Sequence, residues 1–285
     1  MTELVTDPLL RRALLETVIL GLACGPLGVW VLHERRAFAA ESLSHAMLPG
    51  LVLAALAGAP LLLGATGGIV LAAALVALAA RDARVGGDTA VAIVVTTLFG
   101  LGVVLALRPE VPARLAELLF GDPLGATAGD VALAALLCGG VLLALSFGGR
   151  ALRLAAFDPA AAPSLGVRPG RVALALLVLL AVTIAAAAQG LGSLLLVAML
   201  LAPAAAAIRA SDRLAVQLRV AAAIGALSAV CGLELSRSLD VAAGPAIALA
   251  ACAGYVLVAV LRGAPAPGAR RSLRRAPIDQ LTGSR

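Results

Sequence analysis

The sequence contains no lysine, few aromatic residues and little charge of either sign. Charged residues make up 13% and aromatic residues 2% of its 285 residues, whereas 62% are hydrophobic. Soluble domains are about 45–50% apolar and about 25% charged, so this chain departs from them in the direction of a membrane protein. The net charge is +6, but with so few aromatic residues no stacking surface is visible of the kind that proteins binding single-stranded nucleic acid use.

Two further shortages exclude classes of function. The four cysteines, Cys24, Cys138, Cys231 and Cys252, each lie in an apolar stretch, and no two of them form a CxxC pair. Buried cysteine usually behaves as a small hydrophobic residue, so we expect neither disulfides nor a thiolate metal site. No GxxxxGK[ST] sequence is present, so the chain carries no P-loop ATPase of its own.

Apolar runs long enough to cross a bilayer recur along almost the whole chain. A helix needs about 20 predominantly apolar residues to cross the ~30 Å hydrocarbon layer. The expected spans are nine: Leu14–Leu32, Glu41–Gly58, Leu61–Ala80, Thr89–Leu107, Val131–Phe147, Arg171–Ala188, Leu194–Ile208, Leu214–Cys231 and Val241–Leu261. This pattern predicts an all-α fold, a polytopic transmembrane bundle of eight or nine helices, with eight if one span is a half-helix.

The polar segments between the spans predict the orientation and the domain boundaries. Arginines gather in the 148–170 loop and in the tail after Arg262, and both segments are expected in the cytoplasm by the positive-inside rule. Four spans separate them, so the two assignments agree, and with nine spans the N-terminus lies outside. We expect an N-terminal lead at 1–13, one transmembrane domain at 14–262 and a disordered cytoplasmic tail at 263–285.

One polar stretch, from Arg35 to Gly50, interrupts the apolar pattern. Within it Glu41 and His45 are four residues apart, so on a helix they share a face, with about 5–6 Å between their Cβ atoms. An ionisable residue at the centre of a span costs about 2.5–3.5 kcal/mol on insertion scales and is normally kept for a pathway or a pairing. A carboxylate with an imidazole suits Zn²⁺, Mn²⁺ or Fe²⁺, and two ligands alone would hold such an ion transiently.

Spacing alone leaves other interpretations of this stretch open. In the plainest one, Glu41 pairs with Arg35 or Arg36 and His45 bonds a neighbouring carbonyl. A catalytic interpretation lacks a nucleophile–base pair, because Ser44 and His45 are adjacent and point to different faces of a helix.

Other polar or helix-breaking residues have simple structural interpretations. Asp158 followed by Pro159 is a good helix start, and Gly166 would end that helix. Asp122, after Gly121, is as consistent with a turn or cap as with a pathway role. The expected helix breaks are Pro49, Gly50, Pro203, Gly244 and Pro245.

The order of several short motifs resembles one protein family. Ala23–Gly28 (Ala-Cys-Gly-Pro-Leu-Gly), Arg35-Arg36 and Ser44–Gly50 look like the permease subunits of zinc/manganese-type ABC importers. In that family the second helix typically reads as an aspartate, three residues, His-Ala and, soon after, Pro-Gly. Further matching motifs follow in consistent order: Asp88-Thr89-Ala90, Leu119–Asp122, Leu165-Gly166-Val167, Leu200–Ala205 and Ala243-Gly244-Pro245.

The resemblance implies a fold similar to that of the vitamin B12 importer's permease, arranged as a homodimer in the bacterial inner (plasma) membrane. It implies two kinds of partner: a cytoplasmic ABC ATPase on each subunit, and an extracytoplasmic metal-binding protein that delivers the ion. Glu41 and His45 would occupy the family's metal site in the pathway, although aspartate is common where this chain has Glu41. The ATPase-coupling helix would be formed by Asp158, Pro159, Leu165, Gly166 and Val167, and Gly121 and Asp122 would lie in an outer gate region.

The residues and the resemblance together predict a permease subunit of an ABC importer. It would move a divalent transition-metal cation (zinc or manganese, with iron as a third option) into the cytoplasm, with ATP hydrolysis on a partner chain. No permanently bound cofactor and no nucleic acid are expected. A proton-coupled secondary transporter is the alternative, since it would also use an intramembrane carboxylate and histidine.

Overall fold

The computed structural model describes residues 7–79, 87–108, 125–187 and 192–263, and within these ranges every regular element is a helix. The elements are α2 (Pro8–His33), α3 (Ala37–Ala46), α4 (Leu48–Leu56), α5 (Leu61–Ala79), α6 (Gly87–Ala106), α8 (Ala128–Phe157), the 3-10 helix η3 (Pro163–Leu165), α9 (Pro169–Ala187), α10 (Gly192–Ala210), α11 (Leu214–Leu239) and α12 (Ala243–Leu261).

The predicted all-α transmembrane bundle is confirmed. Six helical segments in the described residues are long and apolar enough to cross a membrane, and α3 and α4 together form one of them, Ala37–Leu56. Three shorter apolar helical segments, in α5, α9 and α10, accompany them. Each of the nine spans expected from the sequence therefore corresponds to a helical segment.

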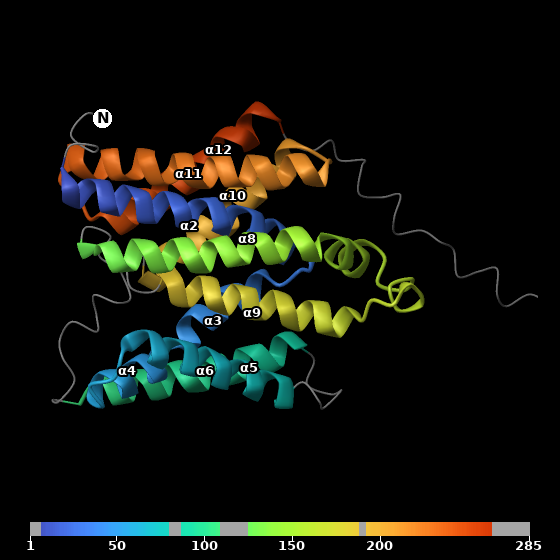
Figure 1. Cartoon of the computed structure of the whole chain (residues 1–285), viewed down its shortest axis with the longest axis horizontal. Coiled ribbons are helices and arrows are strands. Elements are labelled where there is room, and N and C mark those ends of the chain that lie inside the picture. Colours follow the sequence, from blue (N-terminus) through green and yellow to red (C-terminus); the bar gives the residue numbers. More distant parts are fainter. Residues whose placement is uncertain (1–6, 80–86, 109–124, 188–191, 264–285) are drawn as a thin grey trace, which may run out of the picture.

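Helix α2 forms the centre of the bundle. It packs against α8, α10 and α11, and 72% of the residues in its most apolar window are buried, compared with 22% for α12. In Figure 1, α4, α5 and α6 form a separate group along the lower edge, and α3 lies between this group and the rest of the bundle. Helix α3 contacts both groups, since it packs against α5 and α6 on one side and α9 and α10 on the other.

Glycine allows α2 to occupy this central position. A Cβ atom at Gly21 would lie 2.6 Å from the carbonyl oxygen of Gly225 on α11, and a Cβ at Gly25 or Gly28 would overlap the backbone of Ala221 or Leu200. Small residues at such crossings let two backbones approach closely, which stabilises helix pairs in lipid through van der Waals contact. The glycines of α2 therefore specify its two closest neighbours, α10 and α11.

Several helices extend beyond their predicted boundaries, most of all α2, α8 and α11, the last of which ends at Leu239 rather than Cys231. Helix α2 begins at Pro8 rather than near Leu14, because the Asp7 carboxylate caps it by accepting from the backbone N–H of Leu9 at 2.9 Å. Helix α8 continues through the arginine-containing turns after Phe147 and ends at Phe157. Its 30 residues span about 45 Å, more than the ~30 Å hydrocarbon layer. The end of the apolar run at Phe147 therefore indicates where the membrane crossing ends, whereas the helix itself continues further.

The residues expected to break helices lie at three kinds of position: between two helices, inside a helix and in the first turn of a helix. The span containing Pro49 and Gly50 divides into α3 and α4 just before Pro49, whereas Pro203 lies inside α10. Gly244 and Pro245 lie in the first turn of α12, where proline is tolerated because its missing N–H would have no helical partner. This last pair marks the beginning of a helix rather than a kink.

Arginine side chains join the ends of α10 and α12. Arg209 donates from Nη2 to the carbonyl of Gly263, and Arg262 donates from Nη2 to the carbonyl of Ala210. The last carbonyls of a helix have no partner within the helix and attract cations. Each arginine therefore caps the end of the other helix, and both helices end on the same side of the bundle.

A matched pair of glycine substitutions tests the packing of α2. Gly28→Ala should lower the free energy of unfolding by about 1–3 kcal/mol, since the added methyl meets the Leu200 backbone. Gly140→Ala on α8 meets nothing within 4 Å and should raise stability by about 0.5–1 kcal/mol. Thermal unfolding of the purified protein in detergent measures both, and equal melting temperatures for the two variants would contradict this packing.

Candidate functional site

The two residues singled out in the sequence, Glu41 and His45, lie one turn apart on α3. Their neighbours on the helix, Ser42, Leu43 and Ser44, are buried, while the Glu41 side chain is exposed and His45 is half-buried. The described helices therefore leave the Glu41 side chain uncovered, whereas they cover part of the His45 side chain.

A break in the helix follows directly after this pair. Pro49 has no N–H to donate to the carbonyl of His45, four residues earlier, so α3 ends at Ala46 and α4 begins at Leu48. The Ser44 hydroxyl donates to the carbonyl of Glu41 at 2.5 Å and so competes with the helical bond of that carbonyl. Broken helices at membrane depth are tolerated where protein or a water-filled cavity surrounds them, and transporters place ion sites beside them.

The His45 ring is held by an aromatic contact and keeps one nitrogen free. It lies against Phe99 of α6 with ring centroids 5.6 Å apart and an interplanar angle of 68°. Its Nδ1 atom is buried and has no hydrogen-bond partner in the described part of the chain. A buried polar atom without a partner is costly, so a ligand at this nitrogen would relieve that cost.

Glu41 has no arginine partner among the residues that the structure describes. Among the described residues, which include Arg35 and Arg36, no ion pair or hydrogen bond involves its carboxylate. The interpretation in which this residue is neutralised by a neighbouring arginine therefore finds no support in the geometry. A bare carboxylate on a spanning helix is too costly to face lipid, so this surface of α3 needs water, a cation or a polar partner.

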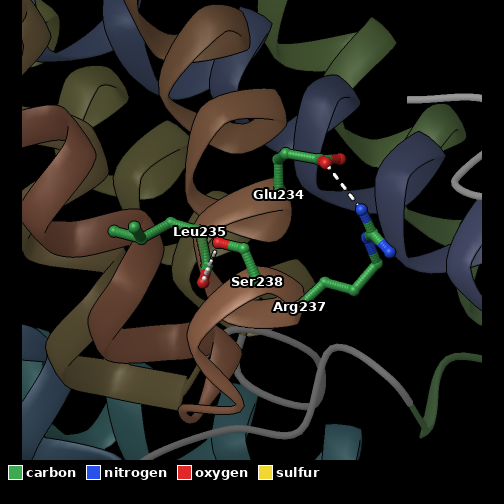
Figure 2. A network of polar contacts seen from close by, with 4 residues as sticks. All are labelled: Glu234, Leu235, Arg237 and Ser238. Atoms are coloured by element: carbon green, nitrogen blue, oxygen red, sulfur yellow. Dashed lines mark hydrogen bonds and ion pairs between the residues drawn. The ribbon is translucent and has the colours of Figure 1, made fainter.

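The acidic residues near the C-terminal end of α11 do have local structural roles, unlike Glu41. Arg237 donates from Nη2 to Oε1 of Glu234 at 2.8 Å, and Ser238 donates to the carbonyl of Leu235 (Figure 2). Asp240 ends the helix in the left-handed conformation, with φ of 53°. No group of three or more His, Cys, Asp or Glu side chains that could hold a metal ion occurs within the described ranges, so the described residues of one chain do not form a complete metal site.

One buried acid was missed in the sequence. Glu16 lies inside α2 with 1% of its surface exposed, and its Oε2 atom has no hydrogen-bond partner in the described residues. The rule that singled out Glu41, an ionisable side chain within an apolar run, applies to Glu16 equally. It faces α8, the helix that carries Asp130 and Cys138.

The predicted coupling helix is a compact set of turns instead of an α-helix. Asp158 accepts from the backbone N–H of Ala161 at 3.1 Å, one α-type bond joins Ala162 to Asp158, and η3 follows from Pro163. Pro163 cannot donate to the carbonyl of Pro159, so the α-helical turn cannot continue. Gly166 closes the segment with φ of 78°, as its predicted role as a terminator requires.

The outer surface of this segment is apolar at its tip. Leu165 keeps 52% of its surface exposed, and Gly166 beside it is also exposed, whereas Val167 is half-buried. Gly121 and Asp122, the expected gate residues, lie outside the described residues.

Comparison with known proteins decides the family. The model of the ABC 3 transport family matches residues 6–262, which is nearly the entire chain. The chain belongs to the ABC 3 transport family.

Family relatives are similar over most of their length. A manganese transport system membrane protein, MntC, of Halalkalibacterium halodurans is 33% identical over 256 residues, covering 90% of this chain and 88% of the relative. A probable iron transport system membrane protein of Haemophilus influenzae is 31% identical over 261 residues, covering 90% of this chain and 96% of that protein. The family membership thus rests on the whole membrane domain and not on one motif.

Solved structures show the same fold. A chain of PsaBC from Streptococcus pneumoniae, solved in complex with Fab, superposes with a TM-score of 0.82 at 27% identity, covering 90% of this chain and 93% of that chain. An inward-facing metal-chelate type ABC transporter, described as putative, matches in fold with a TM-score of 0.70 at 17% identity, covering 90% and 87%. The chain is therefore a multi-pass membrane permease of an ABC transporter.

Thiol labelling tests whether Glu41 faces water. In a variant whose four cysteines are replaced by alanine, Glu41→Cys should react with a charged thiol reagent, because this position is exposed and cannot lie in lipid as a carboxylate. Ser44→Cys, at a position with 1% exposure on the same helix, should react at least about tenfold more slowly. Equal labelling rates in lipid nanodiscs would show that the exposed face of α3 is not hydrated.

Proposed function

We propose that this permease imports a divalent transition-metal cation, manganese, iron or zinc, into the bacterial cytoplasm. The observation that carries the proposal is the unpaired carboxylate of Glu41, one turn from the free Nδ1 of His45, on a helix that must cross the membrane. Manganese and iron are the substrates named for the relatives MntC and the Haemophilus influenzae protein. Carboxylate oxygen and imidazole nitrogen are suitable ligands for all three ions.

The incomplete site supports a homodimer. Among the described residues, one chain offers two candidate ligands on one face of α3, an exposed Glu41 and a half-buried His45. A second copy related by two-fold symmetry would cover this face with the same surface, since such interfaces are self-complementary. Two Glu41–His45 pairs would then face one central pathway, where they would offset part of the cost of dehydrating the ion.

The cytoplasmic end of the bundle supports coupling to a separate ATPase. If the nine helical segments cross the membrane and the first begins outside, the 158–167 segment and the α10 and α12 ends would lie in the cytoplasm, together with most of the arginines. The turns from Asp158 to Val167 project an exposed Leu165, which suits an apolar socket on an ABC ATPase. An extracytoplasmic metal-binding protein would deliver the ion at the opposite end, near Gly121 and Asp122.

Transport would then require only that the dimer open the Glu41–His45 pairs to one side of the membrane and then to the other. ATP binding and hydrolysis on the partner would displace the 158–167 segments and tilt the helices beside α3. Release is favoured because the site is weak, and protonation of His45 would weaken it further, since a ligating imidazole must be neutral.

Uptake by variants of the pair tests the metal pathway. Glu41→Ala and His45→Ala should each reduce manganese uptake by about tenfold or more, because each removes one ligand of a site with few ligands. Glu41→Asp keeps the charge and should retain more uptake than Glu41→Ala. The measurement is initial uptake of radioactive manganese by cells, scaled to the amount of permease in their membranes.

Glu234→Ala serves as the matched control, because that glutamate lies at the far end of α11 beside Arg237. It should transport like the wild type. Wild-type uptake by both Glu41→Ala and His45→Ala would remove these residues from the pathway.

Co-purification tests the coupling segment. Leu165→Glu places a charge on the exposed tip of the 158–167 segment and should reduce recovery of the ATPase subunit with the permease by about tenfold, as expected for an apolar contact residue at the centre of an interface. Leu239→Glu, with 62% exposure at the opposite end of the bundle, should not affect recovery. Equal recovery with both variants would place the ATPase contact elsewhere.

A further inference from the structure

His33, one of only two histidines in the chain, makes two contacts at the cytoplasmic end of the bundle. It is the last residue of α2. Its Nε2 atom lies 2.8 Å from Oε1 of Gln217 on α11, and its ring centroid lies 4.9 Å from that of Phe157, the last residue of α8. Neither contact takes part in the metal site, so their role needs a separate explanation.

The hydrogen bond to Gln217 has a defined direction. Gln217 is 4% exposed, and its Nε2 atom donates to the carbonyl of Ser211 at 2.7 Å, in the turn between α10 and α11. This bond orients the amide so that its oxygen faces His33, and His33 must therefore carry a proton on Nε2. The imidazole is thus anchored to the α10–α11 corner through one nitrogen.

The ring contact reaches the segment proposed to bind the ATPase. Phe157 directly precedes Asp158, and its side chain keeps 58% of its surface exposed, so the His33 ring is a specific contact at the edge of the bundle rather than part of the core. The two rings are tilted by 57°, an arrangement within the range that aromatic pairs favour. A displacement of the 158–167 segment would move Phe157 against His33.

On its other side His33 is joined to the helix of the metal site. Only Glu34, Arg35 and Arg36 separate it from α3. This turn is bonded back onto α2, since the backbone N–H of Glu34 donates to Trp30 and that of Arg36 to Val31, both at 2.9 Å. A shift of the α2 end is therefore transmitted to the beginning of α3, two turns before His45.

We propose that His33 is a positioning residue that transmits motion of the ATPase-coupling segment to α3. It contacts Phe157 at the start of that segment, is anchored by Gln217 and continues through a bonded turn to the Glu41–His45 helix. This inference rests on the proposed function. A contiguous set of contacts does not by itself establish energetic coupling, so the experiment measures coupling directly.

The experiment compares transport with ATP hydrolysis in one preparation. The complete permease–ATPase complex is placed in liposomes, and manganese uptake and phosphate release are measured for the wild type, His33→Ala, Phe157→Ala and the double variant. Manganese carried per ATP hydrolysed should fall by about threefold or more in each single variant. ATPase recovery and hydrolysis should stay within about twofold of the wild type, because no residue of the nucleotide site is changed.

The double variant and a matched control separate coupling from general damage. If the ring contact carries the coupling, the manganese carried per ATP hydrolysed should fall no further in the double variant than in the more impaired single variant. The two single substitutions remove the same interaction. Phe147 lies on α8, the helix that ends at Phe157, and keeps 87% of its surface exposed. Phe147→Ala should therefore leave the manganese carried per ATP hydrolysed unchanged. His33→Gln keeps an amide N–H for Gln217 but lacks the ring, and should resemble Phe157→Ala.

Wild-type ratios in His33→Ala and Phe157→Ala would overturn the proposal, as would losses in the double variant that are the product of the single losses. The melting temperature of each variant is measured as well. If Phe147→Ala is destabilised and also carries less manganese per ATP hydrolysed, the loss in His33→Ala follows from destabilisation, and His33 has a structural role only. The proposed function fails in a different way: the wild-type complex itself would then show no ATP-dependent uptake.

Discussion

The cost of an unpaired carboxylate in a membrane dominates this structure. Glu41 lies on a helix of a segment that crosses the bilayer, yet no cationic side chain neutralises it in the described residues. Lipid cannot accept that group without a penalty of several kcal/mol. The exposed face of α3 must therefore meet water, an ion or another protein surface. The helix break before Pro49 and the Nδ1 of His45, which has no partner in the described residues, also leave polar groups that need such a partner.

The close packing of glycine backbones explains how such a face can be presented at all. Gly21, Gly25 and Gly28 bring α2 against α10 and α11, and a Cβ at Gly50 or Gly64 would overlap the other's backbone across the α4–α5 crossing. These contacts bring together the helices of two groups, and α3 adds Ala40, Leu43 and Ala46 to the hydrophobic core. Helix α3 lies between them (Figure 1), held by contacts on both sides. In this position between the two groups, α3 buries its apolar residues and leaves the Glu41 side chain exposed.

The sequence predicted the helices well, but it predicted their ends and contacts less well. Hydropathy reports which residues can lie in hydrocarbon, so the spans were recovered; it does not report hydrogen bonding, so α8 was expected to end near Phe147 rather than at Phe157. The 158–167 segment was predicted from its Asp-Pro start and Gly166, while the effect of a second proline, Pro163, was overlooked. Glu16 was available to the same rule as Glu41 and was missed. The contact between His33 and Gln217 joins residues 184 positions apart, and no local pattern encodes it.

The incompleteness of the proposed metal site supports a transport role over a resident metal ion. A resident cofactor is held by a full set of ligands, whereas a transported ion must dehydrate partly, bind and leave within one cycle. Within the described residues the chain gathers no cluster of three ligating side chains, and its two candidate ligands lie next to a helix break, where small movements of α3 and α4 alter their geometry. In the proposed metal pathway, the glutamate at position 41 would reach one methylene further than an aspartate, so its carboxylate would follow the ion further from the helix axis. A ligand of this reach beside His45 would favour release of the ion over its retention, as the proposed transport requires.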